Sequence, residues 1–194
     1  MVFQSSTYSV LVVSASKQTD TMIRALLPMT DFWPVNSARG IAEAKDLMLR
    51  DPYDILIIDS QLSADKAFNF AATVCSSGQT SVLLIVGDES FEEIYYKALP
   101  YGIFTISNTA DSSMLGSSLH MLCVMRERLR GYEARQEKVE TKIEEINLLN
   151  RAKWLLIECL NMTEDEAHRY ILRQAMEQRI SKREAAADII RTYQ

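Results

Sequence analysis

The carboxyl-terminal stretch of the chain, residues 150–193, reads NRAKWLLIECLNMTEDEAHRYILRQAMEQRISKREAAADIIRTY. It contains two capping boxes, in which a hydroxyl residue precedes a glutamate by three positions: Thr163 with Glu166, and Ser181 with Glu184. In such a box the hydroxyl accepts a hydrogen bond from an N–H of the first helical turn, and the carboxylate accepts one from the N–H of the cap residue. Each box therefore predicts the start of a helix.

Apolar residues recur at helical spacing on both sides of these boxes. In three successive pieces they are Trp154, Leu155 and Leu156, then Ala167, Ile171 and Ala175, then Ala186, Ile189 and Ile190. The pattern predicts three short helices with breaks near Asn161 and Ile180. Helices of this length bury little surface alone, so we expect them to pack on one another as a small three-helix domain at residues 151–194.

Several residues of this stretch form an ordered pattern. They are Ala152-Lys153, Leu156, Thr163-Glu164, Glu166-Ala167, Arg173, Ala175-Met176 and Ala186. The pattern resembles the ANTAR domain, the RNA-binding output of transcription antitermination regulators such as those of amidase and nitrate assimilation. Trp154 departs from the family, which often has a small residue there. The resemblance implies that the chain binds structured RNA, namely stem-loops of a leader transcript, and thereby prevents a terminator from forming.

Basic side chains are concentrated in the same region. The chain has a net charge of −5, yet residues 169–183 hold five basic side chains and a single acid, Glu177. A local basic patch on an acidic protein favours a selective phosphate-backbone ligand over general nucleic-acid binding. The candidate RNA-binding residues are Lys153, Arg173 and Met176, which match the family pattern, and Arg169, Arg179, Lys182 and Arg183, which are inferred from charge. The alternative is an ordinary solvated helix face.

The amino-terminal half alternates apolar, β-branched runs with helical segments. The predicted strands are residues 8–13, 32–35, 53–58, 81–86 and 102–106, and the helices are residues 21–27, 39–50, 66–75 and 91–99. Pro34 weakens the second strand and suggests an edge position. The alternation predicts an α/β domain at residues 1–112, with a doubly wound, five-stranded parallel sheet.

The segment DILIIDSQL, residues 54–62, resembles the strand that presents the phosphoacceptor aspartate of response-regulator receiver domains. The resemblance implies that the sheet is of the receiver (flavodoxin-like) type and that Asp59 is the phosphoacceptor equivalent. The receiver pattern also has an acidic pair that binds Mg²⁺, and a hydroxyl and a lysine that bind the phosphoryl group. In this chain Ser14 and Ala15 stand at the positions of the acidic pair. Val86 stands at the hydroxyl position, and Asn108, followed by Thr109, stands at the lysine position. Because Mg²⁺ needs several oxygen ligands, the single carboxylate of Asp59 is a poor binding site for it.

We therefore predict a pseudo-receiver in which Asp59 is not phosphorylated and control comes from a sensor or inhibitor protein, or from a small ligand. Asp59 is then a strand-end residue that caps the following loop or helix, and the alternative is an aspartate that is phosphorylated.

Residues 113–160 predict one long helix, because they contain no proline and only Gly116 and Gly131 as glycines. A seam with alternating steps of three and four runs along it through Leu122, Met125, Leu129, Tyr132, Gln136, Val139, Ile143, Ile146 and Asn150. This heptad repeat predicts a two-stranded coiled coil at residues 113–150 and hence a homodimer, with Asn150 fixing the register. The alternative is an amphipathic helix folded back on its own domain. Gly131 marks a joint between the receiver-like part and the coil.

The sequence argues against several other classes of protein. No apolar run approaches the ~20 residues of a membrane span, and the first residues lack a secretion leader. Cys75, Cys123 and Cys159 are widely spaced, so we expect reduced thiols in a cytoplasmic protein. His120 and His168 have no nearby set of Cys or carboxylate residues, so we expect no metal site and no cofactor.

These observations predict a dimeric regulator that binds RNA and has no catalytic residues. Two alternatives remain. One is a DNA-binding two-component response regulator, because a short basic helix pair can form a helix-turn-helix. Residues 178–181 lack the glycine usual in such a turn. The other is an interaction module that sequesters a protein through the coil.

Overall fold

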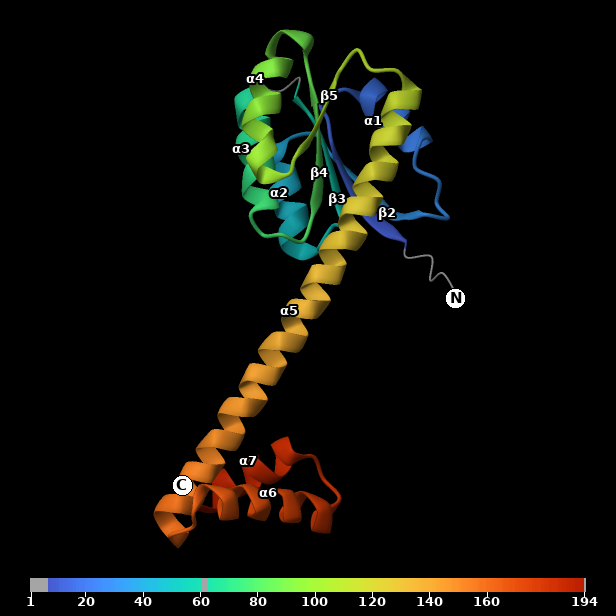
Figure 1. Cartoon of the computed structure of the whole chain (residues 1–194). Helices are drawn as coiled ribbons and strands as arrows, with labels where there is room; N and C mark the ends of the chain where they lie inside the picture. The colour runs from blue at the N-terminus through green and yellow to red at the C-terminus, as the bar shows by residue number, and fades with distance from the viewer. Residues whose placement is uncertain (1–6, 61–62, 194) are drawn as a thin grey trace. The chain divides into compact units, whose positions relative to one another are not determined.

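The computed structural model describes residues 7–60 and 63–193 of the chain (Figure 1). The chain divides after Gly131 into two compact units, one ending at Gly131 and the other beginning at Tyr132. The division falls at the glycine that the sequence analysis places between the receiver-like part and the coil. None of the described helices combines the length and apolarity needed to span a membrane.

A five-stranded sheet forms the centre of the first unit. Its strands are β1 (Tyr8–Val13), β2 (Phe32–Ala38), β3 (Ile55–Asp59), β4 (Ser81–Val86) and β5 (Phe104–Ser107). All four neighbouring pairs are parallel, and the order is β2-β1-β3-β4-β5. The predicted α/β fold class is thus confirmed. β2 lies at the edge, as Pro34 suggests, although the strand continues beyond that proline to Ala38.

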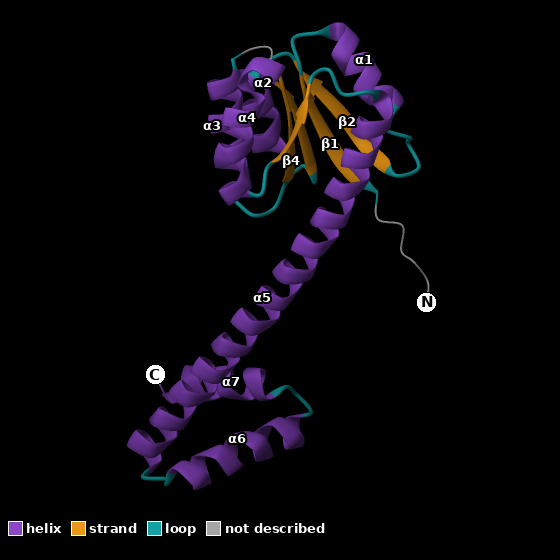
Figure 2. Ribbon diagram, turned by 45° about the horizontal axis from the view of Figure 1, so that its top comes forward, coloured by secondary structure: helices purple, strands orange, loops and turns teal. Residues whose placement is uncertain are grey.

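Helices cover both faces of this sheet, as Figure 2 shows. The helices are α1 (Lys17–Ala25), α2 (Ile41–Arg50), α3 (Ala64–Cys75), α4 (Asp88–Ala98), the short 3₁₀ helix η2 (Leu99–Tyr101) and the start of α5 (Ser112–Leu160). Successive strand residues point to opposite faces. Leu11 and Leu56 accordingly pack in the core under α2, α3 and α4, whereas Val12 and Ile57 pack under α1 and α5. Burial on both faces explains why the strands read as continuous apolar runs.

The first turns of α5 belong to the core of the first unit. Leu115, Leu119 and Leu122 are buried there, and Leu122 is completely inaccessible to solvent. The assignment of Leu122 to an intermolecular seam is therefore wrong. The buried residues Leu115, Leu119 and Leu122 have the same three- and four-residue spacing as the heptad seam. Spacing alone therefore does not distinguish packing on the chain's own sheet from packing on a second helix. Met125 is half-buried, and its Cε lies 3.4 Å from the position that a Cβ on Gly102 would take.

An ionic cluster holds α5 against the end of the sheet at which β3 begins. Asp54, which directly precedes β3, accepts hydrogen bonds through Oδ1 from Nε of Arg126 at 2.9 Å and from a terminal nitrogen of Arg130 at 2.8 Å. Its Oδ2 accepts from the backbone N–H of Ser9 at 3.0 Å. Burial raises the pKa of the Asp54 carboxyl group, but the donors from Ser9, Arg126 and Arg130 outweigh this effect and bring the pKa below its usual value.

The second unit packs the end of α5 against α6 (Glu164–Gln178) and α7 (Lys182–Tyr193). The capping box of Thr163 and Glu166 is present. At the start of α7, Ser181 and Glu184 exchange the corresponding bonds, at 2.8 Å and 3.2 Å. The two breaks lie where predicted, and each contains a residue with positive φ, Asn161 at 53° and Arg179 at 56°.

Small side chains allow these three helices to approach one another closely. The core consists of Ala152, Leu156, Ala167, Ile171, Ala175, Ala185, Ala186, Ile189 and Ile190. Five of these nine residues are alanines, and they include all four alanines of the pattern that resembles the ANTAR domain. The alanines of the pattern therefore pack inside the unit and are not available to contact a ligand.

Candidate phosphoacceptor cleft and nucleic-acid interface

Asp59 is the last residue of β3 and is almost fully buried, at 2% exposure. Parallel pairing places the end of β1 beside it, since Val13 is in register with Ile58. Ser14 follows β1 directly, and its Oγ donates a hydrogen bond to Oδ2 of Asp59 at 2.9 Å. The structure thus brings together the predicted phosphoacceptor equivalent and the hydroxyl at one of the two metal-ligand positions.

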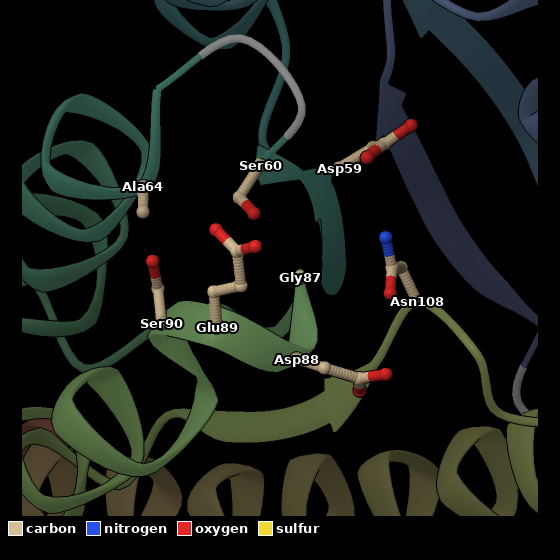
Figure 3. Close-up of a pocket in the computed structure, with 8 residues that line it drawn as sticks. All are labelled: Asp59, Ser60, Ala64, Gly87, Asp88, Glu89, Ser90 and Asn108. Atoms are coloured by element: carbon tan, nitrogen blue, oxygen red, sulfur yellow. The ribbon is translucent and has the colours of Figure 1, made fainter.

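A cleft of about 480 Å³ opens at this end of the sheet (Figure 3). It is lined by Asp59, Ser60, Ala64, Gly87, Asp88, Glu89, Ser90 and Asn108. Three of these residues carry carboxylates and none carries a positive charge. Figure 3 shows the amide nitrogen of Asn108 turned toward the Asp59 side of the cleft. A phosphoryl group would bring further negative charge to this acidic lining, where the receiver pattern requires a metal ion and a lysine.

Asp88 at the start of α4 is bound to the loop after β5. Its Oδ1 accepts a hydrogen bond from Oγ of Ser107, and Oγ1 of Thr109 lies 3.2 Å from the same oxygen. Asn108, at the lysine position, lies between these two hydroxyl residues. Sequence reasoning missed Asp88; the acidic pair directly after the fourth strand was the available signal. Among the described residues, no group of three or more His, Cys, Asp or Glu side chains is arranged to hold a metal ion.

The candidate RNA-binding residues of the second unit fall into two groups. The first lies around the turn between α5 and α6. Lys153 forms an ion pair with Glu164 at 2.8 Å. Arg169 is exposed, with its Nε donating to the carbonyl of Asp165 at 3.2 Å. Arg173 is also exposed, and its guanidinium lies over the ring of Tyr170, 5.4 Å from the centroid.

The second group lies around the turn between α6 and α7. Arg179 ends α6, Lys182 begins α7, and both are exposed. Arg183 forms an ion pair of 3.3 Å with Glu144 of α5. Glu144 precedes the end of α5 at Leu160 by about four helical turns. Six of the seven candidates therefore lie in these two groups, and the seventh, Met176, is exposed on α6.

Exposed apolar side chains continue along α5 within the second unit. Tyr132, Val139, Ile143 and Ile146 are 49–57% exposed, and Gln136 and Asn150 on the same seam are exposed as well. Trp154 is 70% exposed and Met176 on α6 is 79% exposed. Leu129 is half-buried. The predicted seam thus begins inside the first unit and becomes a solvent-exposed stripe only from Tyr132 onward.

Comparison with known proteins identifies the domain in the second unit. Residues 137–190 match the family model of the ANTAR domain. The match begins within the segment predicted as a coiled coil and extends through α6 into α7. A comparison with curated protein sequences gave no match.

Solved structures share the fold of the first unit. A response regulator from Thermotoga maritima is 18% identical, with 60% of this chain and 98% of that chain covered and a TM-score of 0.52. The chemotaxis protein CheY4 of Vibrio cholerae is 20% identical, with 60% of this chain and 99% of that chain covered and a TM-score of 0.51. The signal receiver domain of an HD domain-containing protein from Pseudomonas fluorescens Pf-5 is 20% identical, with 66% of this chain and 93% of that chain covered and a TM-score of 0.56. At such identities the likeness establishes the fold alone. The chain therefore combines a first unit of receiver fold with a carboxyl-terminal segment, residues 137–190, that matches the ANTAR domain.

Proposed function

We propose that this protein is a cytoplasmic transcription antitermination regulator that binds stem-loops of nascent leader transcripts as a homodimer. It catalyses no reaction and requires no cofactor. The match of residues 137–190 to the ANTAR domain carries the proposal. The receiver fold of the first unit supports it, because such a fold suits a regulatory input better than an enzymatic role.

The charge distribution of the second unit supports a phosphate-rich ligand. Arg169, Arg173, Arg179 and Lys182 are exposed, and their positive charges lie on the surface of a protein whose net charge is −5. RNA is read mainly through its loops, its phosphates and its unstacked bases. Exposed guanidinium groups can bind phosphate oxygens in pairs or stack on such bases.

The exposed stripe of α5 supports the homodimer. Val139, Ile143 and Ile146 each leave about half of an apolar side chain in water. An identical helix would cover them in the same heptad register, with Asn150 paired across the seam. Burial of apolar side chains on association stabilises the dimer by roughly 25 cal/mol per Å².

The cleft at Asp59 supports control by means other than phosphorylation. Its lining lacks a lysine and holds three carboxylates, and the buried Asp59 is hydrogen-bonded by Ser14. We therefore expect the upstream signal to be a sensor or inhibitor protein, or a small ligand, that binds the first unit.

Comparing ligands for the full-length protein separates this function from its two rivals. The probes are a pool of RNA hairpins with a randomised loop, a loop-free RNA duplex of the same stem, and the corresponding DNA duplex, all measured by fluorescence anisotropy at one salt concentration. We expect enrichment of particular hairpins, with weaker binding to both duplexes. A preference for duplex DNA would favour a DNA-binding response regulator. No preference for any nucleic acid would favour a protein-sequestering module.

A further inference from the structure

We propose that a hollow at the turn between α5 and α6 receives a single unpaired nucleotide of the bound RNA. The hollow, called the turn pocket below, is lined by Leu160, Asn161, Met162, Glu166, Arg169, Tyr170 and Arg173. This inference rests on the proposed RNA-binding function and adds the place and the chemistry of one contact.

The geometry of the turn pocket follows from the local sequence. Glu166, Arg169, Tyr170 and Arg173 stand at steps of three, one and three along α6, so they share one helical face. The opposite wall is the turn of residues 160–162, where the left-handed conformation of Asn161 redirects the chain. The hollow is open to solvent, and its volume of about 740 Å³ is within the range of sites that hold small organic ligands.

One part of the turn pocket suits a planar base. Met162 and Tyr170 are half-buried and pack against the core of the second unit, so their outer surfaces form a fixed apolar floor with Leu160. The guanidinium of Arg173 lies over the Tyr170 ring, 5.4 Å from its centroid. Aromatic rings and guanidinium planes are the groups on which proteins stack unpaired bases.

Another part suits the phosphate attached to that base. Arg169 and Arg173 both line the pocket and both are exposed. The nearest carboxylate to Arg173 is that of Glu177, at a long 3.9 Å, so a phosphate can compete with it. Exposed ion pairs of this kind contribute little to stability.

The single carboxylate that lines the turn pocket is already engaged. Oε2 of Glu166 accepts hydrogen bonds from the N–H and from the hydroxyl of Thr163, both at 2.8 Å. These bonds lower the pKa of Glu166 and direct its charge toward the start of α6. Two positive charges therefore face an incoming phosphate, and the one negative charge is held at the cap.

The neighbouring hollow on the other side of Tyr170 lacks this chemistry. It measures about 120 Å³ and is lined by Tyr170, Gln174, Gln178, Ala185, Asp188, Ile189, Thr192 and Tyr193. Its charged residue is acidic and no basic side chain lines it. The acidic cleft at Asp59 is likewise unsuitable for a polyanion. Of these three hollows, the turn pocket alone combines an aromatic ring, an apolar floor and positive charge.

The test uses the full-length protein and a hairpin selected from the randomised-loop pool. Each loop nucleotide is replaced in turn by an abasic residue, and binding is measured for the wild type, Tyr170→Leu, Tyr170→Phe and Arg183→Ala. In the wild type we expect one abasic position to weaken binding roughly tenfold. Tyr170→Leu should lose a similar factor with the intact hairpin and be insensitive to that abasic position. Tyr170→Phe should resemble the wild type, and Arg183→Ala should bind more weakly but keep the abasic effect.

A second measurement covers the case in which Tyr170→Leu does not fold. 2-Aminopurine at the sensitive loop position should change its emission on binding to the wild type, because the base becomes stacked. A hairpin that binds with no sensitive loop position, or an abasic effect of full size in folded Tyr170→Leu, would overturn the turn pocket and leave RNA binding intact. Unchanged 2-aminopurine emission would do the same. Failure to enrich any hairpin would overturn the proposed function itself, and the turn pocket with it.

Discussion

Oγ of Ser14 donates a hydrogen bond to Oδ2 of Asp59 across 2.9 Å, and both side chains are buried. Ser14 stands where the receiver pattern has a metal-binding carboxylate. A hydroxyl there supplies a donor to the buried carboxylate and adds no charge that could help to hold Mg²⁺. A buried carboxylate is costly unless hydrogen bonds satisfy it. The contact therefore helps to satisfy the buried carboxylate of Asp59, and we expect that it does not prepare this residue for phosphoryl transfer.

Asp59 should take up no phosphoryl group. Incubation with a small-molecule phosphoryl donor and Mg²⁺ should leave the intact mass of the protein unchanged, because no lysine is among the residues that line the cleft and no group of described side chains is arranged to hold a metal ion. A receiver domain of known activity, treated in parallel, controls for the donor. A phosphate adduct on the peptide that contains Asp59 would show that the cleft is an active receiver site.

The Ser14 contact should be visible in stability. Ser14→Ala removes the donor and leaves a buried carboxylate with one bond fewer, so the free energy of unfolding should fall by about 1–3 kcal/mol. Urea denaturation followed by circular dichroism measures this. The matched control is Ser113→Ala on the exposed first turn of α5, which should change stability by less than about 0.5 kcal/mol. Equal stabilities of Ser14→Ala and the wild type would mean that solvent or another donor replaces the hydroxyl.

Much of the fold follows from the sequence because its signals are local. The strands at residues 8–13 and 81–86 have the predicted bounds, since each is an apolar run between turn-forming segments. α1 begins at Lys17, four residues earlier than predicted, because the cap at Ser16 gives a weak sequence signal. The end of β2 was also missed, because pairing with β1 extends the strand beyond Pro34.

The candidate sites were less predictable, because they depend on contacts between distant segments. The position of Asp59 at the end of a strand follows from the sequence, whereas its bond to Ser14 requires the register of β1 and β3. Their place in one basic stretch of the sequence, residues 169–183, grouped Arg173 with Arg183. In the structure, one faces the turn pocket and the other pairs with Glu144. The burial of Leu122 depends on which face of α5 meets the sheet, and the heptad spacing does not carry that information.

The ionic cluster at Asp54 should make the first unit sensitive to acid. Because the pKa of Asp54 is lowered in the folded protein, its contribution is complete above the unfolded value of about 3.9 and is lost as the pH falls through the folded value. Asp54→Asn should therefore cost about 2–3 kcal/mol at pH 7, and the difference from the wild type should shrink below about pH 4. Unfolding in urea at several pH values measures this.

The exposed Asp51→Asn, three residues earlier, is the control for this pH series and should follow the wild type throughout. A difference between Asp54→Asn and the wild type that stays constant down to pH 3 would show that the carboxylate charge does not hold Arg126 and Arg130 in place.

The exposed stripe of α5 should mediate dimerisation. Replacing Ile143 and Ile146 together with Asp places two charges in the seam, so a dimer of the wild type should dissociate at micromolar concentration. Both side chains are about half exposed in the single chain, so the variant should still fold, and circular dichroism checks this. Lys138→Asp, at an exposed position of α5 off the seam, is the control and should remain dimeric. Analytical ultracentrifugation decides the matter, and a wild type that sediments as a monomer would refute the coiled coil.

The last prediction concerns the ion pair of Arg183 with Glu144, 3.3 Å long in the free protein. If Arg183 contacts the RNA backbone, it must exchange this carboxylate for a phosphate. Glu144→Gln should then strengthen binding of a selected hairpin about two- to fivefold, since an exposed pair is worth at most about 1 kcal/mol. Lys182→Ala with Arg183→Ala should weaken binding, and the slope of log K against log salt should become shallower by about 1 to 2 units.

These two changes act in opposite directions on the same contact, so together they locate the RNA surface. Both substitutions alter exposed side chains and should leave the thermal midpoint almost unchanged. Arg173→Lys, which keeps the charge but loses the planar guanidinium, should lower the affinity for the same hairpin without changing the slope of log K against log salt. If Glu144→Gln and the double alanine both bind as the wild type does, the backbone does not reach the turn between α6 and α7. The RNA surface would then be confined to the side of the ANTAR domain that carries Arg169 and Arg173.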